Sequence, residues 1–302
     1  MSEGSFLTFD GKLVDEGSGK RNYENETLKL LFERSSVRSF LSKKVPENVL
    51  RKVIEAGLHS ASAGNLQPYS IIRVEDENRK KLIAELCLQN FISKAPVLLI
   101  FCLDFHRLER WARLSDAPFT AAQSFRHFWV AFIDVSVCAQ TVCTAAESFG
   151  LGSVYIGTII ESAERVREVL KLPEKVFPII LVCLGYPSFR PKPQKKLGYN
   201  IIVSNEEYFE PSDEELLKAF NEKYDRIRVK VTDERLKLAE EVYRNLLGEE
   251  LAKIFCEKIK ISGYFNPAQY YFLLHYRADL MCRDNELFVK ILEKAGLKFF
   301  KE

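Results

Sequence analysis

A short basic segment near the start of the chain has the side chains needed to bind a phosphate group. Residues 34–38 read Arg-Ser-Ser-Val-Arg, so that the guanidinium groups of Arg34 and Arg38 flank the hydroxyl of Ser36. Alternate residues of an extended segment point to the same side, and a guanidinium can donate two parallel hydrogen bonds to one phosphate. The segment therefore predicts a phosphate site, although two arginines among 44 basic residues are also typical of a solvated surface.

A second segment, about two dozen residues later, suits a flat heteroaromatic ring. Residues 62–67 read Ser-Ala-Gly-Asn-Leu-Gln and lead through Pro68 into an apolar run. Small residues let the backbone approach a ring closely, and the amides of Asn65 and Gln67 can bond its polar edge. Taken alone this is an ordinary loop. Together with the basic segment it predicts a site for flavin mononucleotide (FMN).

Two further segments extend this hypothesis. Residues 153–158 are small or polar and follow a predicted helix, and residues 190–196 form a basic loop rich in proline. Two basic and two polar segments match a ligand with phosphate at one end and a ring at the other, but they can meet only through the fold. Neither a Gly-x-Gly-x-x-Gly fingerprint nor a P-loop opens a helix, so side chains must hold the phosphate.

The composition is that of an ordinary globular protein. The 302 residues are 47% hydrophobic and 28% charged, and the net charge of +2 gives no general electrostatic reason to expect nucleic-acid binding. Seven dispersed cysteines without Cys-x-x-Cys spacing predict reduced core thiols and a cytoplasmic protein. Four histidines without paired spacing predict no metal site. The polar N-terminus and short apolar runs predict a chain that is neither exported nor membrane-spanning.

Hydrophobic periodicity predicts a mixed α and β chain in which strands and helices alternate first and helices follow. A poorly ordered or strap-like lead-in is expected before residue 26. The long helix is apolar nearly all round, which only a central position or a subunit interface can hide. The expected elements are a helix after Pro46, strand 69–74, helix 78–89, strand 97–103, helix 127–149, strand 153–156, helix 163–170, strand 177–184, strand 200–203 and, from Ser212, three or four helices with an N-cap at Asn266 and a stop at Gly296.

From about residue 28 to 224 the chain resembles the FMN-dependent nitroreductases, and more closely their larger NADPH-preferring branch of nitroreductases and flavin reductases. The most specific matches run through residues 133–157, 170–173 and 183–187. The resemblance implies an α+β fold of three layers (α/β/α), with a central, mostly antiparallel sheet flanked by helices. It implies an FMN-binding domain at 26–225 and a helical C-terminal extension at 226–302, packed on the main domain or on a partner subunit.

The resemblance also implies roles for individual residues. Residues of segment 34–38 contact the phosphate and ribityl chain, and residues of segment 62–67 form a loop over the flavin that often comes from the opposite subunit. Gln89 bonds the ring, and the strand end near residue 156 faces flavin N5. Gln194 departs from the family, which usually has a cation there, so Lys192 or Lys195 would have to substitute beside Lys196. The residues are Arg34, Ser35, Ser36 and Arg38; Ser62, Ala63, Gly64, Asn65 and Gln67; Gln89; Tyr155, Ile156, Gly157 and Thr158; and Lys195 and Lys196.

The activity that follows is that of a homodimeric NAD(P)H oxidoreductase. By a ping-pong mechanism, NAD(P)H delivers hydride to flavin N5 and leaves, and a small planar acceptor such as a nitroaromatic, a quinone or free flavin then takes the electrons. No catalytic side chain is expected. Arg226 and Arg228 could meet an NADPH 2′-phosphate or could simply be solvated. Two alternatives stay open: a flavin-binding or flavin-sequestering protein with little turnover, and a reductive dehalogenase of the same fold.

Overall fold

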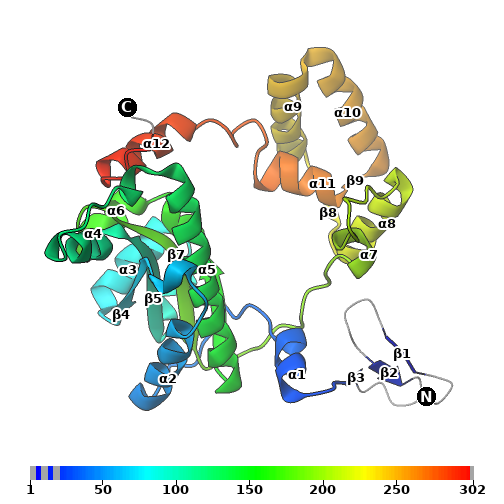
Figure 1. Ribbon diagram of the computed structural model, residues 1–302. Coiled ribbons are helices and arrows are strands. Elements are labelled where there is room, and N and C mark those ends of the chain that lie inside the picture. Colours follow the sequence, from blue (N-terminus) through cyan, green and yellow to red (C-terminus); the bar gives the residue numbers. More distant parts are fainter. Residues whose placement is uncertain (1–4, 8–12, 16–20, 300–302) are drawn as a thin grey trace. The chain divides into compact units, whose positions relative to one another are not determined.

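The computed structural model describes residues 5–7, 13–15 and 21–299 (Figure 1). The chain forms two compact units. The main unit comprises Glu24–Pro193 and Val289–Glu302, and the helical unit comprises Met1–Tyr23 and Gln194–Phe288. The domain boundaries expected from the sequence, at residues 25 and 225, remain a prediction.

A four-stranded sheet forms the centre of the main unit. Its strands are β4 (Tyr69–Val74), β5 (Val97–Asp104), β6 (Gly152–Ile156) and β7 (Val176–Gly185). Their order across the sheet is β4-β5-β7-β6, and every neighbouring pair is antiparallel. The antiparallel sheet expected from the resemblance is thereby confirmed, and β4 and β6 are its two edges.

Helices cover both faces of this sheet and complete a three-layer arrangement. The central strands β5 and β7 are buried at every position, which explains their almost unbroken apolar sequence. One face packs against α3 and α6, through residues such as Ile83 and Val166. The other face packs against α5, which also contacts α2. The helices are α1 (Glu26–Glu33), α2 (Glu47–Leu58), α3 (Glu77–Leu86), α4 (Phe105–Leu114), α5 (Phe125–Ser148) and α6 (Ala163–Leu170), with 3₁₀ turns η1 (Ala63–Asn65), η2 (Asn90–Lys94), η3 (Ala121–Gln123) and η4 (Thr158–Ile160).

The 24-residue helix α5 is the longest element described. It is the one helix among the described residues whose length and composition would suit a membrane span, and 44% of its most apolar window is buried inside the protein. On its outer side Trp129, Ile133 and Val137 follow one another at helical spacing and are 38–56% exposed. We call these three residues the apolar stripe. The helix ends before Gly150, whose φ of 72° is left-handed, as the sequence predicts.

The helical unit contains a small core that includes Val242, Ile259 and Phe265. The capping box expected at Ser212 forms, and Asn266 caps its helix as predicted, in its case also with a capping box. No local pattern predicted the short β8–β9 pair. The elements are β1 (Ser5–Leu7), β2 (Leu13–Asp15), β3 (Arg21–Asn22), α7 (Tyr199–Ile202), α8 (Asp213–Lys223), β8 (Val229–Lys230), α9 (Asp233–Leu247), α10 (Glu249–Ser262), β9 (Tyr264–Phe265), α11 (Pro267–Gln269), the π-helix η5 (Tyr270–His275) and α12 (Asn285–Lys294), whose last turns belong to the main unit.

Two expectations about secondary structure concern residues 200–203 and the lead-in before residue 26. The strand predicted at residues 200–203 is wrong, because α7 forms one helical turn there and the amide of Val203 bonds the carbonyl of Tyr199 at 2.8 Å. Its β-branched residues favour a strand, but a strand also needs a neighbour with which to pair. Much of the lead-in predicted before residue 26 lies outside the described residues. Its described parts include the antiparallel strands β1, β2 and β3.

Candidate functional site

The basic segment 34–38 lies along the outer edge of β6. Ser36 pairs with Ser153 as an isolated parallel bridge, and the amide of Val37 donates to the carbonyl of Ser153 at 2.9 Å. Further along, Phe40 pairs with Pro187 just after β7. An edge strand has unpaired backbone groups, and this segment satisfies some of those on β6. Two of the four segments singled out in the sequence, 34–38 and 153–158, are therefore neighbours.

The side chains of this segment differ in their surroundings. Arg34 is half-buried, and its Nη2 lies 3.4 Å from the hydroxyl of Ser153, whereas its Nε is buried without a hydrogen-bond partner among the described residues. Ser35 is also buried, and its hydroxyl has no described partner. Ser36 and Arg38 are exposed, and Arg38 makes no ion pair within the described chain. A charged group at the surface without a protein partner is available to an anion.

The end of β6 meets the segment before η2. Gln89 donates from its side-chain amide to the hydroxyl of Thr158 at 3.0 Å, and Thr158 in turn donates to the carbonyl of Cys87 at 3.2 Å. Ile156 is buried, whereas Gly157 is exposed, and a Cβ added to Gly157 would meet nothing within 4 Å in the described chain. The structure thus joins Gln89 to the strand end 155–158 and leaves open space beside Gly157.

Tyr155 is a half-buried residue of β6. Its hydroxyl is buried and has no described hydrogen-bond partner. Burial raises the pKa of the Tyr155 phenol, the neighbouring Cys143 thiol adds to the rise, and the charge of Arg34 opposes it. Tyr155 is therefore a neutral phenol at physiological pH.

The loop 62–67 adopts a conformation that most residues avoid. Gly64, Asn65 and Gln67 have φ values of 57°, 55° and 49°, in the left-handed region. The loop is bonded at both ends. The side-chain amide of Gln67 donates to the carbonyl of Leu58 at 2.9 Å, and the amide of Ala63 donates to the buried carboxylate of Asp134 on α5. The side-chain amide of Gln67, which was expected to bond the ligand, is thus engaged with the end of α2.

Within one chain this loop lies far from the basic segment. The loop precedes β4 at one edge of the sheet, and Tyr69 is level with Phe177 across the intervening strand. The basic segment lies beyond β6, at the opposite edge, where Ser153 pairs with Leu184 near the other end of β7. Four strand intervals of about 4.8 Å separate them, roughly 19 Å across the sheet alone. One chain does not bring these two predicted groups together.

Two carboxylates that the sequence reasoning missed support the site from α5. Asp134 bonds the loop, as described above. Glu147 is buried at the other end of the helix and forms an ion pair with Arg190, which also donates to the carbonyl of Leu151 at 3.2 Å. Burial raises the pKa of the Glu147 carboxyl, and the charges of Arg190 and Arg34 oppose that rise. For Asp134 the signal was an acidic residue in an otherwise apolar stretch of helix, whereas Glu147 stands between Ala146 and Ser148 without such a signal.

The remaining predicted residues, Lys195 and Lys196, belong to the helical unit. Lys195 forms an ion pair with Asp225 at 2.7 Å. This contact lowers the pKa of the Asp225 carboxyl. Lys196 is exposed and makes no ion pair among the described residues. Lys196 is thus the freer of the two cations.

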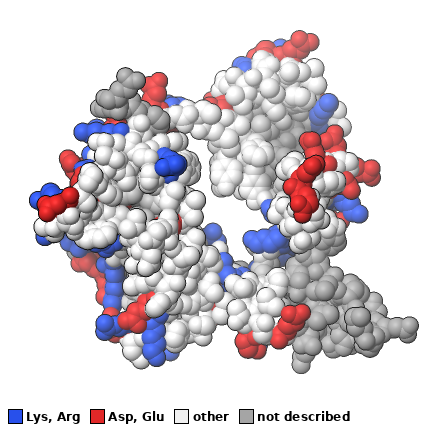
Figure 2. All heavy atoms as spheres, viewed as in Figure 1, with Lys and Arg blue, Asp and Glu red and all other residues white. Residues whose placement is uncertain are grey.

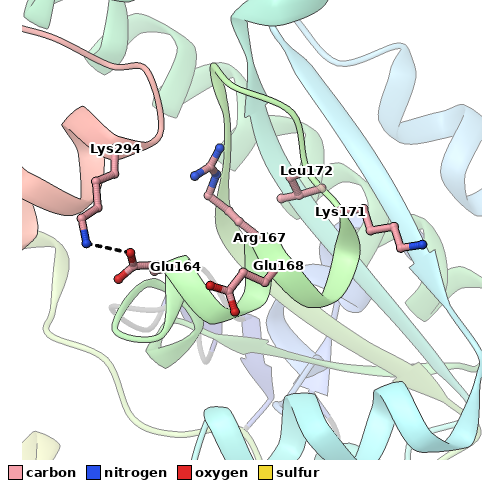
Figure 3. Close-up of a pocket in the computed structure, with 6 residues that line it drawn as sticks. All are labelled: Glu164, Arg167, Glu168, Lys171, Leu172 and Lys294. Carbon is pink, nitrogen blue, oxygen red and sulfur yellow. Dashed lines mark hydrogen bonds and ion pairs between the residues drawn. The ribbon is translucent and has the colours of Figure 1, made fainter.

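A charged cavity beside α6 lies apart from the predicted site residues. A cavity of about 390 Å³ on the outer side of α6 is lined by Glu164, Arg167, Glu168, Lys171, Leu172 and Lys294 (Figure 3). Three of its charged side chains already have partners: Lys294 pairs with Glu164 at 2.9 Å, and Arg167 donates to the carbonyls of Val176 and Pro173. None of the predicted site residues lines it.

In Figure 2 charges of both signs are mixed over the visible surface, while the area over α5 is largely without them. Within the described residues, no group of three or more His, Cys, Asp or Glu side chains could hold a metal ion.

Comparison with known proteins gives these contacts a context. The model of the Nitroreductase family matches residues 31–186, from just before the basic segment to the end of β7. The chain belongs to the nitroreductase family. The resemblance seen in the sequence is therefore confirmed, and the family match spans the sheet, α2 to α6 and the polar residues on them.

Individual members of the nitroreductase family are similar over most of their length. An "FMN reductase [NAD(P)H]" of Bacillus subtilis is 34% identical over 61% of this chain and 75% of its own. An "Oxygen-insensitive NADPH nitroreductase" of Salmonella typhimurium is 33% identical over 65% of this chain and 80% of its own.

Solved structures extend the similarity to the fold of nearly the whole chain. The hypothetical oxidoreductase YcnD of Bacillus subtilis superposes with a TM-score of 0.71 at 28% identity, covering 92% of this chain and all of its own. An NADPH:FMN oxidoreductase of Vibrio harveyi, solved in complex with NAD⁺, gives a TM-score of 0.61 at 25% identity, over 84% of this chain and 98% of its own. These likenesses bear out the three-layer nitroreductase fold.

Proposed function

We propose that this nitroreductase-family protein is an NAD(P)H oxidoreductase that uses FMN and works by a ping-pong mechanism. The observation that carries the proposal is the pairing of segment 34–38 with the edge of β6. That pairing places cationic and hydroxyl side chains along the same edge strand that ends just before Gly157. FMN is the cofactor and NAD(P)H the electron donor. The names of both sequence relatives agree with this chemistry.

The residues in this region fit FMN in charge and shape. Arg34 and Arg38 can neutralise a phosphate dianion, and the exposed hydroxyl of Ser36 can donate to it. The open space beside Gly157 accommodates a flat ring, and a side chain at this position would partly fill that space. Gln89 and Thr158 hold one another beside the same strand end, so their polar atoms are already oriented. Backbone and amide groups can thus stabilise negative charge on a reduced ring.

Bound FMN supplies the redox chemistry, accepting a hydride from NAD(P)H and passing the electrons to an acceptor in a separate half-reaction. The contribution of the chain is to bind and orient. Its arginines hold the phosphate end, its small residues allow the backbone to approach the ring, and the neutral Tyr155 lies in the buried layer beneath. We assign no nucleophile and no general base. A nitroaromatic, a quinone or free flavin is the proposed class of acceptor.

The proposed assembly is a homodimer in which each site uses both subunits. The loop 62–67 is separated from Arg34 of its own chain by most of the sheet, so only a second copy can bring both groups to one ligand. The apolar stripe of α5 is a suitable contact surface, because a two-fold axis would place the same stripe of each subunit face to face. Burying these side chains would remove exposed apolar area from water. We also propose a cytoplasmic location.

The helical unit has a proposed role in nucleotide and phosphate recognition. Lys196 is free of described ion pairs and is the proposed phosphate cation, whereas Lys195 would have to leave Asp225 to take part. Arg226 and Arg228 are exposed in the same unit and could meet the 2′-phosphate of NADPH. A weakened phosphate site would favour the alternative of a flavin-binding protein with little turnover.

Rapid mixing under argon tests the proposed function. The purified protein should show the absorption spectrum of an oxidised flavin, and NADPH or NADH should bleach it within the time of one turnover. Subsequent addition of a quinone or nitroaromatic should restore the colour of the oxidised flavin, as a ping-pong cycle requires. A flavin that binds but stays oxidised would favour the sequestering alternative. A colourless protein that takes up no added FMN would contradict both.

A further inference from the structure

Asp134 is a buried carboxylate that the proposed chemistry does not use. It lies near the middle of α5 with 5% of its surface exposed. Its two oxygens lie 3.2 and 3.1 Å from the amide nitrogen of Ala63, in the loop 62–67, and no other hydrogen bond to this carboxylate is found in the described chain. The two residues are 71 positions apart, so this contact exists only because the loop folds against α5.

Folding stability alone does not explain a carboxylate at this position. Removing a charge from water costs free energy unless hydrogen bonds replace the lost solvation, and a single amide replaces only part of it. Burial accordingly raises the pKa of the Asp134 carboxyl, and the bond from Ala63 opposes that rise. Its neighbours in sequence, Ile133 and Val135, are apolar. An apolar side chain would be more stable at this buried position. The presence of a carboxylate therefore needs an explanation other than folding stability.

The conformation of the loop supplies such a reason. Asn65 and Gln67 both have left-handed backbone angles, which are unfavourable for residues other than glycine. The second half of the loop is held by the Gln67 side chain and by Arg107 of α4, which donates to the carbonyl of Gln67 at 3.2 Å. The first half is tied to another element through Ala63 and Asp134. Without that bond the 3₁₀ turn η1 would be anchored at one end only.

We propose that Asp134 is a positioning residue, which holds the amide of Ala63 and thereby keeps the loop 62–67 in the shape that receives the flavin. The inference rests on the proposed function, because it takes the loop to be part of the FMN site. Asp134 itself is not a catalytic residue, since its carboxylate bonds the loop. It also lies beside Ile133 of the apolar stripe, so one turn of α5 supports both the loop and the proposed subunit contact.

The test is a titration of the apo-protein with FMN, in which fluorescence quenching reports binding. Asp134→Ala removes the acceptor and should raise the Kd for FMN by roughly tenfold or more. Asp134→Asn keeps an acceptor oxygen of nearly the same shape and should stay within about threefold of the wild type. The matched control is Asp76→Ala, which removes a carboxylate that caps α3 by accepting from the amide of Arg79 at 2.9 Å. It should leave the Kd for FMN unchanged.

A second variant covers the possibility that Asp134→Ala does not fold. Ala63→Pro removes the donor instead, and it suits the first position of a 3₁₀ turn because Ser62 before it is already extended, with φ −143° and ψ 150°. It should weaken FMN binding as Asp134→Ala does, and the double variant should be no worse than either. A folded Asp134→Ala or Ala63→Pro protein with wild-type affinity would overturn the inference, as would an Asn variant as weak as the Ala variant.

Amide hydrogen exchange on the apo-protein separates this inference from the proposed function. Exchange at residues 63–67 should be roughly tenfold faster or more in Asp134→Ala than in the wild type, and unchanged in Asp76→Ala. If the wild type binds no FMN at all, the proposed function fails, and the flavin role of Asp134 fails with it. If the wild type binds FMN and Asp134→Ala exchanges no faster, only the role of Asp134 is overturned.

Discussion

Val37 fills the space that a side chain on Gly152 would need. A Cβ built on Gly152 would lie 2.5 Å from Cγ2 of Val37, closer than real Cβ contacts come. The absence of that side chain lets segment 34–38 approach β6 closely enough for the amide of Val37 to bond Ser153. Gly157, at the other end of the same strand, faces open space instead. The two glycines should therefore respond differently to the same substitution.

Gly152→Ala should destabilise the protein, whereas Gly157→Ala should not. The first forces an added methyl into Val37, which costs about 1 to 3 kcal/mol. The second has φ −78° and ψ −28°, which alanine adopts without strain. Yet Gly157→Ala should weaken FMN binding by roughly tenfold or more, because its methyl would enter the space proposed for the ring. Urea denaturation and FMN titration measure the two effects. Unchanged FMN affinity in a stable Gly157→Ala protein would argue against a ring there.

Arg38→Ala should release FMN without unfolding the protein. Loss of one charge-assisted contact to phosphate costs about 1.5 to 3 kcal/mol, equivalent to a rise in Kd of roughly 10- to 150-fold. Arg51→Ala is the control, since Arg51 is an exposed arginine that pairs with Glu55 on α2. It should leave the Kd for FMN within twofold, as about 0.4 kcal/mol would allow. Retention of cofactor by Arg38→Ala at wild-type affinity would refute the phosphate assignment.

Arg190→Ala should destabilise the protein in a way that depends on pH. It leaves the buried Glu147 without its ion-pair partner, at a cost of about 2 to 3 kcal/mol near pH 7, below the range for a fully buried pair because Arg190 is one-third exposed. Arg165→Ala, which breaks an exposed pair with Glu168, should cost less than about 1 kcal/mol.

The sign of the pH effect follows from the pKa of Glu147. Burial already raises this pKa above its ordinary value of 4.5, and loss of Arg190 raises it further. The folded state then holds the proton more tightly than the unfolded state, so the variant loses stability as pH rises from about 4.5 through the raised value. The deficit relative to the wild type should be smaller at pH 5 than at pH 7. Urea denaturation at both values checks this, and equal deficits would contradict it.

Ile133→Glu should convert the proposed dimer into a monomer. It introduces a charge into the apolar stripe, and a carboxylate buried against a second copy without a partner costs ~3 kcal/mol or more. FMN affinity should fall in the same variant, because the site would lose the partner's loop. Sedimentation velocity measures the association. The control is Ile261→Glu on α10, where the side chain is 85% exposed. A dimeric Ile133→Glu protein with wild-type FMN affinity would exclude the stripe as the interface.

Local patterns in the sequence were sufficient for most elements. Strand β4 and helix α6 have the predicted bounds, and the capping boxes at Ser212 and Asn266 form, because periodicity and caps depend on residues only a few positions apart. The same locality explains the failures. The strand predicted at residues 200–203 rested on three β-branched side chains, but a turn of helix forms at residues 199–202, and the short pair β8–β9 has too few residues for a periodic signal.

For the site, the sequence by itself determined which chemical groups exist: two arginines around a hydroxyl, a small polar loop, and a strand end at Gly157 in a recognisable family pattern. Tertiary structure alone decided which of them meet. It brought Arg34 to Ser153 and Gln89 to Thr158, set the loop 62–67 against Asp134 at the far edge of the sheet, and paired Glu147 with Arg190. Such contacts join residues from 43 to 119 positions apart. They depend on strand order and helix packing, which the whole chain determines and no short segment encodes.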